Sequence, residues 1–492
     1  MENFHTDAQI YAHSLKSTRL FQQKREQMGK KKEILIENLE ITDAGAEGNC
    51  IGRHDGAVVF VPFVVPGDVV DVLAKKKHSY YEGKVTRMVS CSADRVEPRC
   101  SHFGICGGCK WQQMAYERQL FYKQKQVFDH FTRIGKFPFP EISPIIASAE
   151  IFRYRNKIEY TFSDRKWLSK ADLEKADELE TRGLGFHLPS LFDKILNIDH
   201  CHLHSEKGNL IRNAIRDYAI GQNLTFWHAR KQEGLLRNLI LRRSTTGDYM
   251  LIMVFSEWNK QSEGVMSFIR DTFPEITSLM YVINQKPNDS ISDLETFTYA
   301  GKDHMMEQMR DLRFKVSPLA FYQTNAAQAL QLYSHAANLA AIQPHECVYD
   351  LYTGTGTIAL FVARNAKKVI GIEYVLSAVE DAKVNAQINN IDNVEFVAGD
   401  MAKIFTDSFI GLHGKPDVII TDPPRAGMHP QVIAQILKIA PHRIVYVSCN
   451  SATQARDISL LSESYVVTAV QPVDMFPHTQ HVENISLLQR KN

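Results

Sequence analysis

From residue 317 onwards, short apolar runs alternate with glycine turns and helix-like stretches, and this succession constrains the fold most. The runs predicted as strands are Val348–Tyr352, Lys368–Ile372, Val394–Val397, Val418–Thr421 and Ile444–Val447. Strands that alternate with helical segments are typical of an α/β domain with a largely parallel sheet. We therefore expect a Rossmann-like domain over residues 317–492, with its ligands at the carboxyl ends of the strands.

A glycine turn after the first run predicts a nucleotide-type cofactor site. Gly354-Thr355-Gly356 precedes a helix-like stretch, and the second run ends in Glu373. An acidic side chain about twenty residues beyond such a turn is where a ribose diol is expected. Asp400 follows the third run. This segment by itself fits NAD as well as S-adenosylmethionine.

The fourth and fifth runs end in Asp422-Pro423-Pro424-Arg425 and in Cys449. The first motif is similar to that of amino-group methyltransferases, except that Arg425 replaces the aromatic residue. A thiol beside a cofactor site predicts covalent attack on an electrophilic carbon, such as C6 of uracil. Addition of the thiolate at C6 makes C5 of the base nucleophilic. The C5 proton must then go to a base, for which Glu483 is the candidate. Taken singly, Cys449 is better interpreted as a buried structural cysteine and Glu483 as a surface carboxylate, but together with the other two strand-end motifs the catalytic interpretation is favoured.

The N-terminal region predicts a tail and a small barrel. Residues 1–32 are polar and basic and are expected to be disordered, with Met28 as an alternative start. Over residues 33–92, β-like runs at Ile34–Ile36, Ala57–Val61, Val69–Val72 and Lys84–Met88 alternate with Gly and Pro turns. This spacing predicts a β-barrel, whose basic loop Lys75–His78 could contact phosphates.

Residues 93–316 predict a central α+β domain with a cysteine cluster. Cys100-x5-Cys106-Gly-Gly-Cys109 precedes a helix-like stretch from Tyr116 to Ile134. Eight cysteines in 492 residues are too few for a disulfide scaffold, so these three indicate a metal or iron–sulfur site. A [4Fe–4S] cluster or a structural zinc would each need a fourth ligand, and Cys91 is a candidate from spacing. The chain has no apolar stretch of membrane-spanning length and no secretory signal, so we expect a cytoplasmic protein.

Four motifs now point to a family. Tyr349–Thr357, Thr421–Gly427, Val447–Asn450 and His481–Asn484 occur in the order found in RNA uridine-C5 methyltransferases that use S-adenosylmethionine, and the chain resembles them from about residue 33 to its end. The barrel resembles a TRAM domain, an OB-like RNA-binding module. The resemblance implies Cys449 as the nucleophile and Glu483 as the proton acceptor. It implies a cofactor pocket built from Gln323, Tyr352, Thr357, Glu373, Asp400 and Asp422.

The resemblance also implies a [4Fe–4S] cluster held by Cys100, Cys106, Cys109 and the distant Cys201. One departure is that Thr353 and Thr357 stand where many members carry Cys and Asn, which puts a side-chain role of Thr357 in doubt. Barrel and cluster together resemble the RlmD-type branch, which acts on 23S ribosomal RNA. The alternatives are a tRNA uridine, a radical enzyme of the methylthiotransferase kind, and a non-catalytic RNA-binding factor.

Overall fold

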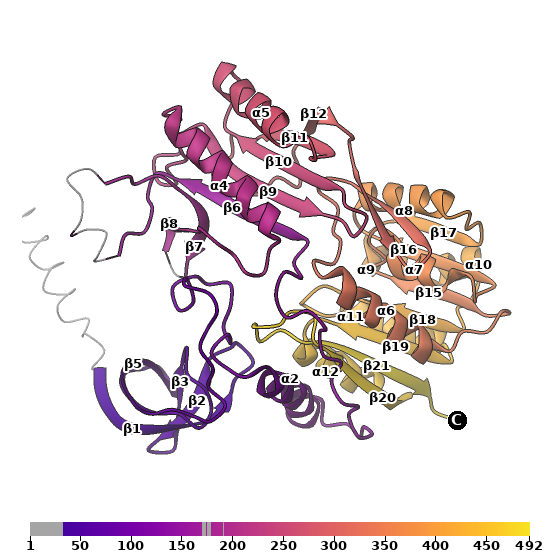
Figure 1. Cartoon of the computed structure of the whole chain (residues 1–492). Coiled ribbons are helices and arrows are strands. Elements are labelled where there is room, and N and C mark those ends of the chain that lie inside the picture. Colours follow the sequence, from indigo (N-terminus) through magenta and orange to yellow (C-terminus); the bar gives the residue numbers. More distant parts are fainter. Residues whose placement is uncertain (1–32, 170–173, 175–178, 190) are drawn as a thin grey trace, which may run out of the picture. The chain divides into compact units, whose positions relative to one another are not determined.

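The computed structural model describes residues 33–169, 174, 179–189 and 191–492, shown in Figure 1. The tail predicted over residues 1–32 lies outside these residues. The chain divides into two compact units, one of residues up to Glu97 with Gln113–Ala115, the other of Pro98–Gln112 with Tyr116–Asn492. No helix within the described ranges is long and apolar enough to cross a membrane.

The first unit contains a closed five-stranded barrel in the order β1-β2-β3-β5-β4. Its strands are Glu33–Ala44, Cys50–His54, Ala57–Val61, Val69–Lys76 and Tyr80–Ser90. At Gly52 an added Cβ would lie 2.9 Å from the Glu40 carbonyl oxygen, so β1 and β2 can approach this closely only with glycine. The predicted barrel is confirmed, although β2 was not predicted. The predicted basic loop is wrong in part, because Lys75 and Lys76 belong to β4.

The second unit begins with the cysteine segment, a helix and a mixed sheet. The helix α2 (Tyr116–His130) continues as a π-helical turn, η1 (Phe131–Gly135), which confirms the helix predicted there. The sheet has seven strands in the order β12-β11-β10-β9-β6-β7-β8. These strands are β6 (Lys157–Ser163), β7 (Gly183–Leu188), β8 (Leu191–Asn197), β9 (Leu236–Arg243), β10 (Tyr249–Phe255), β11 (Ser278–Ile283) and β12 (Thr296–Gly301).

The central sheet is covered on one face by two helices, α4 (Glu206–Gly221) and α5 (Lys260–Thr272). Its other face shares a core with the C-terminal sheet, because Ile252 and Val254 of β10 belong to the same apolar cluster as Val348 and Val369. A hairpin, β13 (Met305–Met309) and β14 (Leu312–Val316), adds Phe314 to this cluster. The central and C-terminal parts of this unit are therefore joined by continuous apolar packing.

The C-terminal sheet has seven strands in the order β17-β16-β15-β18-β19-β21-β20. The first five are parallel: β15 (Cys347–Leu351), β16 (Lys368–Glu373), β17 (Val394–Ala398), β18 (Val418–Thr421) and β19 (Arg443–Ser448). They match the predicted strands. The antiparallel pair β20 (Tyr465–Val473) and β21 (Glu483–Arg490), which was not predicted, extends the sheet beyond β19.

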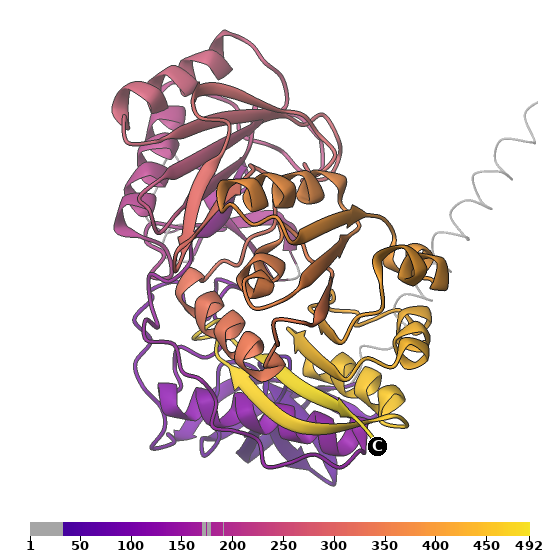
Figure 2. The ribbon, with the colours of Figure 1, turned by 90° about the vertical axis from the view of Figure 1, so that its right-hand side faces the viewer.

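Helices cover both faces of this sheet (Figure 2). One face packs against α6 (Ala326–Ala340), α7 (Thr357–Ala363) and α8 (Leu376–Ile388). The other packs against α2, α9 (Met401–Ile404), α10 (Asp407–His413), α11 (Pro430–Ile439) and α12 (Ser451–Leu461). This arrangement leaves the carboxyl ends of β15, β16, β18 and β19 along one edge, as expected for a ligand site of an open α/β sheet.

Candidate active site

The turn after β15 is built around two glycines and a buried carboxylate. Gly354 and Gly356 have φ of 57° and 81°. A Cβ on Gly356 would lie 2.8 Å from the Phe396 ring, so only glycine fits there. Asp350 Oδ2 accepts hydrogen bonds from Thr353 Oγ1 (2.5 Å) and from the Ala359 amide (3.0 Å). Asp350, for which no role was predicted, ties the turn to the first residues of α7.

Three predicted cofactor residues lie at the ends of adjacent strands. Glu373 ends β16, and its carboxylate accepts hydrogen bonds from the amides of Gly354 (3.0 Å) and Val375 (2.9 Å). Tyr352 follows β15 in a left-handed conformation, φ 67°. Asp400 follows β17 and caps α9 through Ala402 N (3.1 Å). Since β15, β16 and β17 are neighbours, these residues share one edge, and Thr357 begins α7 beside them.

The sequence of this segment fits both NAD and S-adenosylmethionine, and the charge at this edge of the sheet favours one of them. Asp350, Glu373 and Asp422 lie close enough that the last two raise the pKa of Asp350, which burial raises most, to about 7. Clustered carboxylates repel the anionic pyrophosphate of NAD and attract the cationic sulfonium of S-adenosylmethionine. A Cβ built on Gly354 would meet no atom within 4 Å, so the turn faces open space. These residues therefore fit S-adenosylmethionine.

A thiol and two carboxylates meet at the ends of β18, β19 and β21. Because β19 and β21 are antiparallel with Ser448 opposite Asn484, Cys449 comes next to Glu483. Burial, and then the charge of Asp422, raise the pKa of Glu483. Burial, followed by Glu483 and Asp422, raises the pKa of the Cys449 thiol to about 11. The structure thus brings together Cys449, Glu483 and Asp422, and it holds the thiol protonated at neutral pH.

Arg425 opposes these shifts and was not predicted as a site residue. Its charge lowers the pKa of both Cys449 and Glu483. The Arg425 carbonyl accepts hydrogen bonds from Asn450 Nδ2 (3.0 Å) and Thr453 Oγ1 (3.2 Å) at the start of α12. Cys449 directly precedes the cap of this helix, Asn450. The amino end of a helix and a nearby guanidinium both favour a thiolate.

Gln323 approaches the same site from the segment before α6. It is buried, and its side chain hydrogen-bonds with the Tyr333 hydroxyl. Burial and then the charge of Asp422 raise the pKa of Tyr333 well above its usual value, which places Tyr333 beside that carboxylate. All six predicted cofactor residues therefore lie at this edge. Tyr333 also lies there but was not predicted, because its position inside an amphipathic helix does not distinguish it from a core residue.

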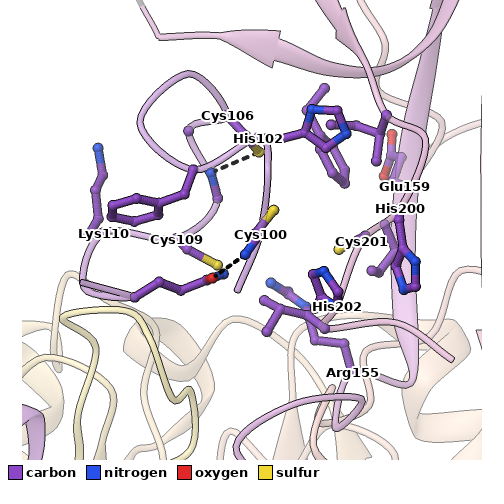
Figure 3. Close-up of a pocket in the computed structure, with 18 of the residues that line it drawn as sticks. Cys100, His102, Cys106, Cys109, Lys110, Arg155, Glu159, His200, Cys201 and His202 are labelled. Atoms are coloured by element: carbon purple, nitrogen blue, oxygen red, sulfur yellow. Dashed lines mark hydrogen bonds between the residues drawn. The ribbon is translucent and has the colours of Figure 1, made fainter. Parts of the chain in front are cut away.

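Cys100, Cys106, Cys109 and Cys201 line one cavity of about 660 Å³ (Figure 3). Figure 3 shows their four sulfur atoms facing the same space, with His102, His200 and His202 around it. Burial raises the pKa of Cys106 to about 11 and that of Cys109 to about 12. Within the described ranges, no three or more His, Cys, Asp or Glu side chains are arranged to hold a metal ion. Cys91, the alternative fourth ligand, is exposed at the end of the barrel segment.

Known families match both ends of the chain. Residues 298–491 match the family described as tRNA (Uracil-5-)-methyltransferase, and residues 25–84 match the TRAM domain. An uncharacterized RNA methyltransferase of Bacteroides thetaiotaomicron is 54% identical over 452 residues, which cover 90% of this chain and 99% of the relative. The chain belongs to the RNA (uracil-C5) methyltransferase family.

Two further comparisons extend this result. An uncharacterized RNA methyltransferase of Porphyromonas gingivalis is 49% identical over 92% of this chain and 99% of its own. The crystal structure of the tRNA (uracil-54, C5)-methyltransferase of Pyrococcus abyssi, in complex with S-adenosyl-L-homocysteine, has a TM-score of 0.72 and 26% identity. It covers 92% of this chain and 100% of its own length. This RNA (uracil-C5) methyltransferase therefore uses S-adenosylmethionine, as the sequence predicts.

Proposed function

We propose that this methyltransferase modifies C5 of a uridine in 23S ribosomal RNA through a covalent Cys449 adduct. The observation that carries the chemistry is the meeting of Cys449, Glu483 and Asp422 at the carboxyl edge of one sheet. The choice of ribosomal RNA is supported by the TRAM match and by the cysteine cavity, which together resemble the branch that acts on 23S rRNA.

The chain's own residues account for the steps before and after methyl transfer. The Cys449 thiol loses its proton to solvent, helped by Arg425 and the amino end of α12, and the thiolate forms a bond to C6 of the uracil. The electron pair of the C5–C6 double bond then makes C5 nucleophilic. Glu483 takes the C5 proton, the double bond re-forms, and the C6–S bond breaks to release the thiolate. Burial and then the charge of Asp422 raise the pKa of Glu483 to about 8, so its ionised form, which accepts this proton, is a stronger base than an ordinary carboxylate.

S-adenosylmethionine, when bound, supplies the electrophilic methyl group. We assign its pocket to Gln323, Tyr352, Thr357, Glu373, Asp400 and Asp422. Glu373 keeps acceptor capacity for ribose hydroxyls beyond its two backbone amides, since a carboxylate offers about four acceptor sites. The Thr353 hydroxyl donates to Asp350, a strong bond that the cysteine of many relatives could make only weakly. Thr357 contributes its position at the first turn of α7.

We assign a [4Fe–4S] cluster to Cys100, Cys106, Cys109 and Cys201. Burial raises the pKa of these thiols, and a metal that supplies compensating positive charge would favour their ionised form, so the cavity suits metal-bound thiolates. A tetrahedral zinc would draw four sulfurs to about 4 Å from one another, because each Zn–S bond is about 2.3 Å. A cubane places each thiolate on a different iron and so spreads them.

Substituting Cys201→Ser is expected to remove the cluster. The wild-type chain, purified without oxygen, should contain about four iron and four sulfide per chain, and the variant should retain little of either. Metal analysis by mass spectrometry with a sulfide assay measures both. Cys91→Ser is the matched control and should keep its full iron content. Loss of iron in Cys91→Ser alone would make Cys91 the fourth ligand, and zinc in the wild-type chain would contradict the cluster.

A tRNA uridine is the second candidate substrate. The Pyrococcus abyssi enzyme, which acts on uracil-54 of tRNA, matches this chain over nearly its whole length. The experiment that separates the two is nucleoside mass spectrometry on 23S rRNA and tRNA from a deletion strain and its parent. We expect 5-methyluridine to disappear from the rRNA alone. Disappearance from tRNA would keep the chemistry and overturn the ribosomal substrate, and disappearance from neither would overturn both assignments.

A further inference from the structure

The loop of residues 474–482 joins β20 to β21 and ends at Glu483, and we call it the catalytic loop. Its first residue, Asp474, is fully buried and is held by two side chains of α2. Lys123 Nζ lies 2.5 Å from Asp474 Oδ1, and the Tyr116 hydroxyl lies 2.8 Å from Oδ2. Gln328 of α6 donates to the Asp474 carbonyl at 2.8 Å. The start of the loop is therefore fixed by buried polar contacts from outside its own strands.

The middle of the catalytic loop is bonded to the cysteine segment. The His478 carbonyl accepts hydrogen bonds from the amides of Lys110 (2.9 Å) and Trp111 (3.0 Å), the two residues that follow Cys109. Gln119 of α2 completes a ring, since its side-chain oxygen accepts from the His478 amide (2.8 Å) and its nitrogen donates to the Trp111 carbonyl (2.9 Å). Gln119 and Trp111 are buried.

The segment that carries Cys201 reaches the same histidine. The Phe152 ring stacks on the His478 ring with centroids 4.4 Å apart and meets the His202 ring edge-on at 6.2 Å. The Arg153 amide donates to the His202 carbonyl at 2.8 Å. The Tyr154 hydroxyl donates to the Pro477 carbonyl at 3.0 Å. The segment after Cys109 thus contacts His478 directly, the segment that carries Cys201 is connected to it through Phe152, and His478 lies five residues before Glu483.

We propose that the state of the cysteine cavity sets the position of the catalytic loop, and that Gln119 is the positioning residue that couples them. The inference rests on the proposed roles of Glu483 and of the four cysteines. A shift of the Cys109 segment alone would leave buried hydrogen-bonding groups of His478, Trp111 and Gln119 without partners. Because unpaired buried polar groups are costly, the catalytic loop moves with the segment. The cavity then acts on catalysis without touching the reacting atoms.

The test compares Gln119→Leu with Gln124→Leu in the full-length chain, purified without oxygen. Gln124 is the matched control, because it also lies on α2 and also bonds a backbone amide, that of Ile145 (2.8 Å), outside the catalytic loop. We expect Gln119→Leu to lower kcat about 100-fold, as for a misplaced catalytic group, with KM for S-adenosylmethionine unchanged. Gln124→Leu should keep the wild-type kcat.

Two further measurements report on the catalytic loop itself. Hydrogen exchange of residues 474–483 should be faster in Gln119→Leu than in Gln124→Leu. Alkylation of Cys449 by iodoacetamide, followed by peptide mass spectrometry, should also be faster, since Glu483 raises the pKa of this thiol and would move away. Chelating the iron from the wild-type chain should speed exchange of residues 474–483, with no further increase in Gln119→Leu. If Gln119→Leu does not fold, Gln119→Glu replaces it, because it keeps the acceptor for His478 and loses the donor to Trp111.

Equal rates of hydrogen exchange and of Cys449 alkylation in the Gln119 and Gln124 variants would overturn the coupling. An exchange rate in the wild-type chain that does not change when the iron is removed would also overturn it. A wild-type chain that holds no iron as purified would overturn the cluster and with it the control by the cavity, while the Gln119 comparison would still decide the positioning role. Full turnover in Glu483→Gln would instead overturn the catalytic assignment, and it would leave the exchange results unaffected.

Discussion

Replacing Cys449 with alanine is expected to lower 5-methyluridine formation about 10⁴-fold or more, as when a nucleophile is removed from an enzyme that works by covalent catalysis. Without the thiolate, no bond forms at C6 and C5 of uracil stays a poor nucleophile. Cys449 lies at the end of β19, whereas the predicted cofactor residue Glu373 ends β16, and Tyr352 and Asp400 follow β15 and β17. The affinity for S-adenosylmethionine should therefore change little. Transfer of a labelled methyl group to RNA and calorimetry of cofactor binding measure the two quantities.

The matched control for this experiment is Cys347→Ala. Cys347 begins β15, so it lies in the same sheet as Cys449 but at the amino ends of the parallel strands, away from the candidate site. It should keep its methylation activity within a small factor of the wild-type value. Continued methylation in Cys449→Ala would show that the reaction needs no covalent adduct and would overturn the mechanism.

The strands of the C-terminal sheet could be predicted because each is a short apolar run that ends at a chemically informative residue. Val348–Tyr352 differs from β15 by one residue at each end, and Lys368–Ile372 differs from β16 by one residue at its carboxyl end. The antiparallel β21 could not be placed in this way, since strand pairing depends on contacts far along the chain. Its register is nevertheless what puts Glu483 next to Cys449. The sequence could name the two residues, and the sheet explains why they meet.

Buried polar residues limited the prediction of the site for a different reason. Gln119 and Lys123 are polar residues of a helix and are typical of a solvent-exposed face, yet both are fully buried. Their partners, His478 and Asp474, lie more than 350 residues further along the chain. A carboxylate such as Asp350 inside an apolar strand gives a local signal, because burial without a partner is costly. Gln119 gives no such signal in the sequence, and only the folded chain shows its hydrogen-bond partners.

The second large effect is expected from Glu483→Gln, which keeps the size of the side chain and removes its ability to accept the C5 proton. Attack by Cys449 and methyl transfer would still proceed, but the C6–S bond could not break until the proton left. We therefore expect turnover to fall about 10²–10⁴-fold, as for loss of a general base, while a covalent complex of protein and methylated RNA accumulates. Denaturing electrophoresis with labelled RNA detects this complex, and digestion followed by mass spectrometry locates the adduct on the Cys449 peptide.

Two observations separate this outcome from a simple loss of structure. The double variant Cys449→Ala, Glu483→Gln should form no complex, because the adduct needs the thiol. Burial and then the charge of Asp422 raise the pKa of Glu483 in the folded chain to about 8. Above the unfolded pKa, folding must therefore either protonate this carboxylate or bury its charge, which costs stability, whereas below the unfolded pKa the carboxyl is protonated in both states and this cost is absent. Removing the charge should thus leave the melting temperature at neutral pH equal to or above that of the wild-type chain. A variant that turns over freely without trapping RNA would assign the proton to another group, and Asp422, the carboxylate that most strongly raises the pKa of Glu483, would be the next residue to test.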